Sequence, residues 1–233
     1  MVADHRSASY NSAMVAPRRV ALIFDMDNTL IGSQIDFLAI RRALVALLRA
    51  AGAVLDADEV LMPLPLAQLA AIGSAHDCAH GTDLARRIWE IIEAHEATGL
   101  RNAPPLDKAD EVLAALRARG FRIAILTNSG RAGALEALRL AGLIECAETI
   151  VARDDVRAMK PAGDGVGEAV RRLGDIKQAY VIGDSWIDGA AAAQAGALFI
   201  AYRRAAEDFK DRGIRPWRTI EHLSELLTLD FSA

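Results

Sequence analysis

Residues 20–30 of the chain read Val20-Ala-Leu-Ile-Phe-Asp25-Met-Asp27-Asn28-Thr-Leu30, a short apolar run that ends in two carboxylates. The run has the length and apolarity of a buried parallel strand. Asp25, Asp27 and Asn28 are poor strand residues, so we expect the strand to end there and a loop to begin. Open α/β sheets bind ligands at the carboxyl ends of their strands, which makes the two acids candidate site residues. Taken alone, the stretch is also compatible with an ordinary Asp-rich turn after a strand.

The composition limits the class of protein. The chain has 233 residues, 52% hydrophobic and 25% charged, which is enough for one large domain or a domain with an insert. A net charge of −4 provides no broad basic face, so we expect no nucleic-acid partner. Two cysteines, Cys78 and Cys146, are too few for a disulfide framework and indicate reduced thiols in a cytoplasmic protein. No apolar run approaches the roughly 20 residues that span a bilayer, so we expect no membrane partner.

Apolar runs alternate with helical patterns over most of the chain. This alternation predicts an α/β fold with a doubly wound parallel sheet of five strands and helices on both faces. The expected strands are residues 20–24, 121–126, 148–151, 179–182 and 198–202. The expected helices that follow them are residues 106–119, 131–141, 164–173, 187–195 and 222–229.

Residues 33–102 depart from this alternation, because nothing in them resembles a strand. Three stretches have helical spacing: residues 35–50, 66–72 and 83–97. Thr82 can cap the last of these, and His95 is a candidate for its buried face. We therefore predict three parts: a disordered leader at 1–17, a core at 18–32 and 103–233, and an all-helical insert at 33–102.

Polar residues follow three further expected strands or their loops. Thr127, Asn128 and a glycine come after the second strand, where backbone N–H groups can face an anion. Lys160 lies before Pro161 in the long loop after the third strand.

Asp184 and Asp188 follow the fourth strand, and two acids four residues apart can share one cation. Together with Asp25 and Asp27 they place four acids at one sheet edge. Clustered carboxylates repel one another and desolvate badly, so such a group normally holds a metal. An all-oxygen ligand set favours Mg²⁺ that keeps several waters.

These features, in chain order, resemble the four motifs of the haloacid dehalogenase (HAD) superfamily. The motifs are Asp25-x-Asp27-x-Thr29, Thr127, Lys160-Pro161 and Gly183-Asp184-x-x-x-Asp188. The resemblance runs from Val20 to about Tyr202. The helical insert resembles the C1 cap of that superfamily, and the nearest likeness is to its phosphoglycolate phosphatase-like branch.

The resemblance implies a Mg²⁺-dependent phosphatase that acts on a small phosphorylated metabolite. By that resemblance, Asp25 attacks phosphorus and forms an aspartyl-phosphate. Asp27 acts as general acid and base and offers its backbone carbonyl to the metal. The implied metal ligands are Asp25, Asp27, Asp184 and Asp188, and the implied phosphoryl-binding groups are Thr127, the Asn128 N–H and Lys160.

Other functions of the same motifs stay open. Asp27 argues against a haloacid dehalogenase, whose chemistry needs no leaving-group acid. The lack of lysine in residues 33–102 argues against a phosphonoacetaldehyde hydrolase. A phosphomutase and a catalytically silent binding or regulatory protein both remain alternatives. Phosphoglycolate is the expected substrate by resemblance alone, and both a monomer and a homodimer are compatible with the sequence.

Several residues outside the motifs are weaker candidates. His76-Asp77-Cys78-Ala79-His80 lacks the spacing of a structural zinc site, and we interpret it as an exposed loop. Arg41-Arg42 and Arg86-Arg87 are possible substrate contacts, and at least one of each pair is expected at the surface. Arg153 and Arg157 precede Lys160 and are candidate substrate or structural partners.

Overall fold

The computed structural model describes residues 19–231, so the predicted leader lies outside the described residues. Their central feature is a parallel sheet of order β3-β2-β1-β4-β5-β6. The α/β prediction is therefore confirmed, with one strand more than expected. The strands are β1 (Val20–Asp25), β2 (Arg122–Leu126), β3 (Thr149–Val151), β4 (Gln178–Gly183), β5 (Leu198–Tyr202) and β6 (Arg218–Ile220).

Strand β1 lies in the middle of the sheet and is buried on both faces. Leu22 and Phe24 belong to one apolar cluster, whereas Ala21 and Ile23 belong to a second on the opposite face. An uninterrupted apolar run suits this position, because a central parallel strand meets helices on both sides. β1 pairs with β2 and β4, and Asp25 lies opposite Leu126. Its two neighbours therefore end beside it, which brings their following loops together.

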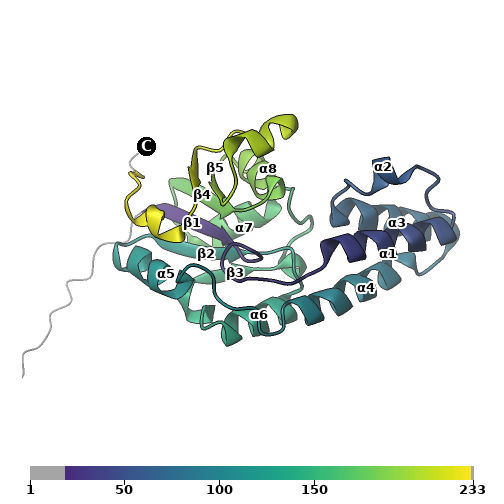
Figure 1. Ribbon diagram of the computed structural model, residues 1–233, viewed down its shortest axis with the longest axis horizontal. Coiled ribbons are helices and arrows are strands. Elements are labelled where there is room, and N and C mark those ends of the chain that lie inside the picture. Colours follow the sequence, from purple (N-terminus) through teal and green to yellow (C-terminus); the bar gives the residue numbers. More distant parts are fainter. Residues whose placement is uncertain (1–18, 232–233) are drawn as a thin grey trace, which may run out of the picture.

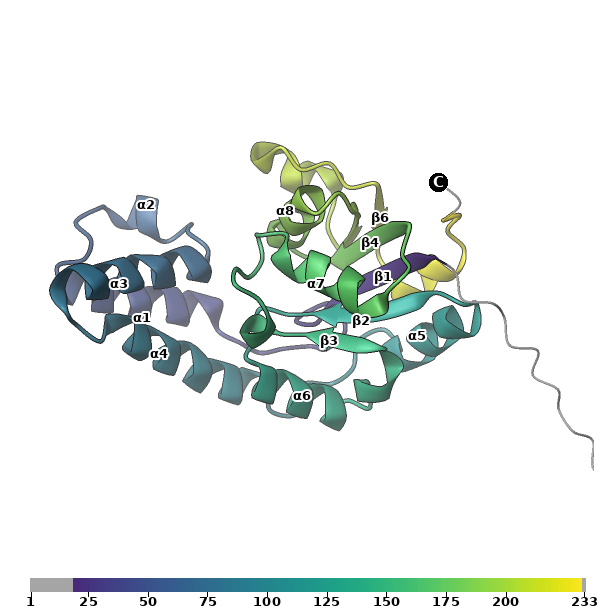
Figure 2. The same ribbon diagram turned by 180° about the vertical axis from the view of Figure 1, so that it is seen from behind.

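Helices cover the two faces of the sheet in pairs (Figures 1 and 2). Residues of α5 (Ala109–Ala118) and α6 (Arg131–Leu140) join the first cluster. Residues of α7 (Asp164–Leu173) and α8 (Trp186–Gln194) join the second. No helix within residues 19–231 has the length and apolar character that crossing a membrane requires.

Four helices between β1 and α5 form a separate layer beside the carboxyl edge of the sheet (Figure 1). They are α1 (Phe37–Ala50), α2 (Asp58–Leu61), α3 (Leu66–His80) and α4 (Leu84–Gly99). The chain enters and leaves this layer at one place, since the Gln34 N–H donates to the Gly99 carbonyl at 2.9 Å. A Cβ at Gly99 would lie 2.5 Å from Ile35 Cα, so glycine permits this close approach. The division into a core and an inserted domain remains a prediction.

Helix α3 is longer than expected, so the loop interpretation of residues 76–80 was wrong. His76, Cys78 and His80 lie in its last turns, and it ends at Gly81, whose φ is +66°. Its alanine-rich sequence has too weak an apolar periodicity to reveal the continuation. The rings of His76 and His80 lie 4.4 Å apart, one turn from each other.

The cap of helix α4 also differs from the expectation. The Asp77 carboxylate accepts from the backbone N–H groups of Leu84 at 2.7 Å and Ala85 at 2.8 Å. Thr82 donates to the same carboxylate instead of capping the helix. A cap supplied by the preceding helix has no local sequence signature.

The end of the chain holds the unexpected strand and a misassigned helix. β6 has three residues, of which Arg218 and Thr219 are exposed, so it lacks the apolar run by which the other strands were recognised. Residues 222–229 were expected to be α-helical, but the structure has a 3₁₀ helix there, Leu223–Leu227. Its first turn is fixed by side-chain acceptors, with Asp107 accepting from the Leu223 N–H at 2.6 Å.

Candidate active site

Three acids meet at the carboxyl edge of the sheet. Asp25 ends β1, Asp184 follows β4, and Asp188 lies in the first turn of α8. One carboxylate oxygen from each lies within 4.8 Å of the other two. Gly183 leaves room for this, because a Cβ there would lie 2.4 Å from the Asp188 carboxyl carbon.

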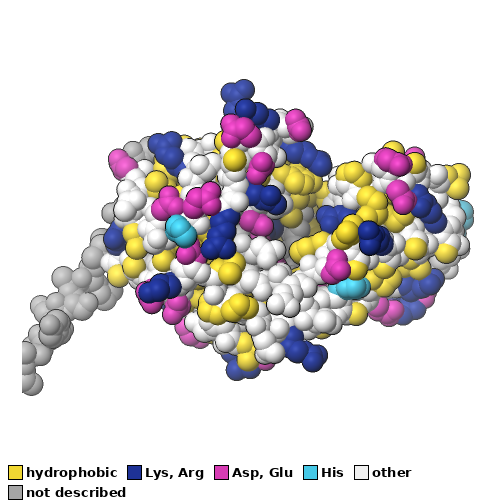
Figure 3. Space-filling view, viewed as in Figure 1, with side chains coloured by type: hydrophobic (Ala, Val, Ile, Leu, Met, Phe, Trp, Pro, Cys, Tyr) yellow, Lys and Arg dark blue, Asp and Glu magenta, His cyan; other side chains and the backbone are white. Residues whose placement is uncertain are grey.

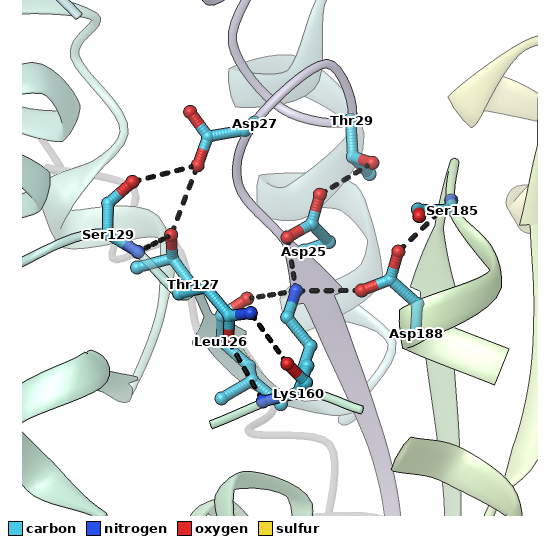
Figure 4. A network of polar contacts seen from close by, with 10 residues as sticks. Asp25, Asp27, Thr29, Leu126, Thr127, Ser129, Lys160, Ser185 and Asp188 are labelled. Atoms are coloured by element: carbon cyan, nitrogen blue, oxygen red, sulfur yellow. Dashed lines mark hydrogen bonds and ion pairs between the residues drawn. The ribbon is translucent and has the colours of Figure 1, made fainter. Parts of the chain in front are cut away.

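Lys160 supplies the positive charge inside this cluster (Figure 4). Its Nζ donates to Asp25 Oδ1 at 2.5 Å and to Asp188 Oδ1 at 2.7 Å. It also donates to the Leu126 carbonyl at 3.2 Å, and the residue is only 2% exposed. Burial alone lowers a lysine pKa, but the two carboxylates outweigh it and raise the pKa of Lys160. The two carboxylates therefore favour the charged form of the ammonium.

The acids still carry an excess of negative charge, with three carboxylates against one ammonium. Burial raises the pKa of Asp25 well above its usual value, Lys160 opposes this rise, and Asp188 adds to it. Burial, followed by repulsion from Asp188, raises the pKa of Asp184 to about 6. A divalent cation bound by all three would offset the excess, and carboxylate oxygens are the donors that hard cations prefer. Asp25, Asp184 and Asp188 therefore fit a divalent metal ion.

The Asp27 carboxylate points away from this cluster (Figure 4). Its Oδ2 accepts from Thr127 Oγ1 at 3.1 Å and from Ser129 Oγ at 3.2 Å. Its Oδ1 is buried and has no hydrogen-bond partner among residues 19–231. Burial raises the pKa of Asp27, opposed first by Lys160 and then by the bond from Thr127. A carboxyl group with a raised pKa and a free oxygen is suited to exchanging a proton with a bound molecule.

The loop after β2 connects these groups. The Asn128 side chain holds the main chain of Lys160, donating to its carbonyl at 2.8 Å and accepting from its N–H at 2.9 Å. Thr127 Oγ1 accepts from the Ser129 N–H at 3.0 Å. The Asn128 side chain therefore positions the lysine, which leaves the backbone N–H of Asn128 as the group that the resemblance assigns to phosphate.

Two hydroxyl contacts were not anticipated. Thr29 donates to Asp25 Oδ2 at 3.2 Å, and Ser129 donates to Asp27 as described. Each hydroxyl lies in a segment already singled out, four residues after Asp25 and two after Thr127. Their position in those loops is the signal in the sequence that points to these contacts.

Glu96 was also missed. It is a buried acid on α4, at the place expected for the neighbouring His95, which is only half-buried. It continues the stripe of Ile88 and Ile92 at four-residue spacing, so a charge in an apolar stripe was the available signal.

A cavity of about 340 Å³ lies between the acids and the helical layer. The space-filling view shows the surface hollowed between these two parts (Figure 3). The helical side of the cavity is lined by Phe37, Arg41, Pro65, Leu66, Ala67, Trp89, Ile92 and Glu96. The lining residues therefore come from both the acid cluster and the helices.

The weaker arginine candidates fall into two groups, those that line the cavity and those at the surface. Arg41 and Arg153 line the cavity. Arg42, Arg86, Arg87 and Arg157 are exposed, and Arg86 forms ion pairs with Asp83 and Glu90. At least one member of each arginine pair is thus at the surface, as expected, and in the second pair both are exposed.

Metal binding should be visible as a gain in thermal stability. MgCl₂ at roughly a hundred times its dissociation constant should add about 2.7 kcal/mol to the free energy of unfolding. The gain should shrink below pH 6, because a proton on Asp184 competes with the cation for the same carboxylate. Differential scanning calorimetry about one pH unit above and below 6 measures both effects. Asp184→Asn should abolish the gain and the exposed control Asp208→Asn should keep it; an equal gain in both variants contradicts the assignment.

Comparisons with known proteins agree on the family. The family model for haloacid dehalogenase-like hydrolases matches residues 20–196. A phosphoglycolate phosphatase from Cereibacter sphaeroides is 31% identical over 189 residues, which cover 78% of this chain and 84% of that protein. Pyrophosphatase PpaX from Halalkalibacterium halodurans is 30% identical over 128 residues, which cover 54% of this chain and 59% of that protein.

A solved structure has the same fold. A hydrolase from Pseudomonas syringae superposes with a TM-score of 0.64 at 23% identity, covering 89% of this chain and 96% of that one. The family match spans β1 to α8 and includes Asp25, Lys160 and Asp188. The chain therefore belongs to the haloacid dehalogenase-like hydrolase family.

Proposed function

We propose that this hydrolase releases phosphate from a small phosphomonoester through an aspartyl-phosphate on Asp25. The observation that carries the proposal is the pairing of two unlike carboxyl groups at one sheet edge. Asp25 belongs to a metal-compatible acid cluster and contacts Lys160, whereas Asp27 has a raised pKa and a free buried oxygen. The phosphoglycolate phosphatase among the relatives supports the same reaction, and the pyrophosphatase supports phosphoryl hydrolysis in general.

In the first half of the reaction, the Asp25 carboxylate forms a bond to phosphorus while the bond from phosphorus to the leaving oxygen breaks. Asp27 gives its proton to that oxygen, so the leaving group departs as an alcohol. Burial supports this role because it raises the pKa of Asp27 and keeps the proton available.

In the second half, a water molecule attacks the phosphorus and gives a proton to Asp27. The bond between phosphorus and Asp25 breaks, phosphate leaves, and the Asp25 carboxylate and the Asp27 carboxyl group are restored. The two acids thus return to their starting states without another reactant.

Lys160, Thr127 and the Asn128 N–H would hold the phosphoryl oxygens while charge moves between the two half-reactions. Mg²⁺ held by Asp25, Asp184, Asp188 and the backbone carbonyl of Asp27 would neutralise phosphoryl charge when bound. Lys160 is prepared for this role, since its charge is already buried beside Asp25.

The nucleophile assignment predicts the behaviour of one substitution. Asp25→Asn removes the attacking oxygen's charge, so release of phosphate from p-nitrophenyl phosphate should fall by at least about a thousandfold. A phosphate-release assay with MgCl₂ measures it, and Asp208→Asn is the control, an exposed acid that does not line the cavity. Undiminished release by Asp25→Asn would refute the nucleophile role. Absence of release by the wild-type enzyme across a broad panel of phosphomonoesters would favour a catalytically silent protein.

Arg41 supports a substrate with a second anionic group, such as phosphoglycolate. Its side chain lines the cavity, and within the described part of the chain it donates only to the backbone carbonyls of Leu64 at 3.4 Å and Phe37 at 3.3 Å. Among residues 19–231 no carboxylate forms an ion pair with it. A carboxylate on the leaving group would therefore find an uncommitted, half-buried cation.

The substitution pair Arg41→Gln and Arg42→Gln tests this role. Arg41→Gln should raise KM for phosphoglycolate by about tenfold and leave KM for p-nitrophenyl phosphate nearly unchanged, because only the first has a second anion. Arg42 is exposed on the same helix and its substitution should change neither value. Steady-state kinetics on both substrates measures these KM values. An equal rise in KM for the two substrates in Arg41→Gln would contradict a contact between Arg41 and the carboxylate of phosphoglycolate.

A further inference from the structure

Arg153 connects helix α4 of the helical layer to the loop that follows β2 at the site. It begins the short 3₁₀ turn after β3, and its side chain is 9% exposed. Its Nη1 donates to Glu96 Oε1 on α4 at 2.7 Å and to the Asn128 carbonyl at 3.4 Å. The guanidinium also lies 4.6 Å from the centre of the Trp89 ring. Its Nη2 also donates to Glu93 Oε1 at 3.4 Å. One core side chain therefore contacts three residues of α4 and the loop after β2.

The residues around Arg153 pack closely against its guanidinium. Glu96 Oε2 accepts from the backbone N–H of Gly130 at 3.2 Å, so the acid is held from two sides. A Cβ at Gly130 would lie 2.8 Å from Arg153 Nη2, and the absence of a side chain there leaves room for the guanidinium. The buried pair is thus part of a close-packed contact and differs from an adjustable surface ion pair.

The contact continues to Lys160 through Asn128. Arg153 donates to the carbonyl of Asn128, and the Asn128 side chain makes two hydrogen bonds to the main chain of Lys160. Lys160 in turn donates to Asp25 and Asp188. A series of contacts therefore runs from α4 to the proposed nucleophile.

We propose that Arg153 is a positioning residue that couples the docking of α4 to the placement of Lys160 against Asp25. This inference rests on the proposed phosphatase function for its kinetic consequence. When α4 is docked, Glu96 fixes Arg153, Arg153 fixes the Asn128 peptide, and Asn128 fixes Lys160. Without the guanidinium the Asn128 loop loses that restraint, and Lys160 is no longer held in place against Asp25.

Arg153→Met tests the proposal because it keeps an unbranched stem beside Trp89 and removes the donors. Misplaced Lys160 should lower kcat for p-nitrophenyl phosphate by about tenfold to a hundredfold, with KM within a factor of about two. Arg172→Met is the matched control. Arg172 pairs with Asp155 of the same turn at 3.3 Å and with Glu168 at 2.7 Å but does not line the cavity. It should lose stability without losing kcat.

A second variant and a second readout guard against loss of folding and against failure of the proposed function. Glu96→Gln keeps an acceptor for Gly130 and should lower kcat in the same direction by a smaller factor. Hydrogen exchange of residues 157–163 should be about tenfold faster in Arg153→Met and unchanged in Arg172→Met, whatever the substrate.

Unchanged kcat and unchanged exchange in Arg153→Met would overturn the inference while wild-type turnover left the proposed function intact. A rise in KM alone would assign Arg153 to substrate contact and would also overturn it. If the wild-type enzyme released no phosphate, the proposed function would fail, and the exchange of residues 157–163 would still decide whether Arg153 restrains the Lys160 segment.

Discussion

The structure of this site depends on the burial of one ammonium among carboxylates that cannot all ionise without it. Asp25 and Asp188 are almost fully buried, and Lys160 is their shared ion-pair partner. Leaving either charge unpaired at that depth costs several kcal/mol, so the three side chains specify one another's positions. The remaining excess of negative charge is what makes the cluster suited to a divalent cation. The same electrostatic balance thus stabilises the carboxyl edge of the sheet and suits it to the proposed phosphoryl chemistry.

The sheet topology makes this balance possible. Parallel pairing of β1 with both β2 and β4 places three strand ends side by side, and each end contributes one functional loop. The helical layer shares a continuous apolar cluster with one face of the sheet, which includes Leu44, Ile88 and Leu22. Its inner surface therefore faces the acids at a defined place and closes a cavity over them. The proposed catalytic groups lie at the ends of the strands and in the segments that follow them, and the residues available for substrate selection come largely from the helices.

The sequence predicted the features that repeat along the chain. Apolar runs that end in Asp25, Thr127 and Asp184 were found because a buried strand and its polar end have a local signature. The bonds of Asn128 to Lys160 depend on tertiary placement, and nothing at either position announces them. The burial of Glu96 was not predicted, because helical periodicity assigns apolar residues to the buried face and acids to the surface.

The predicted ends of several helices and strands were wrong for a different reason. The extension of α3 to His80 and the cap from Asp77 to α4 follow from contacts between two helices, which no single stretch encodes. β6 forms because β5 offers it an edge to pair with, although its own residues have little strand character. Contacts between elements determine these features, whereas the apolar pattern of the sequence determines the other strands and helices.

The central claim is that Asp25 carries the phosphoryl group between the two half-reactions. Rapid acid quench of the Mg²⁺-loaded enzyme during turnover of a phosphoryl-labelled substrate, followed by peptide mapping, tests it directly. The account predicts a phosphorylated peptide with the label on Asp25, removable by hydroxylamine as an acyl phosphate is, and absent from Asp25→Asn. Label on any other residue, or turnover with no labelled peptide at any quench time, would contradict the account.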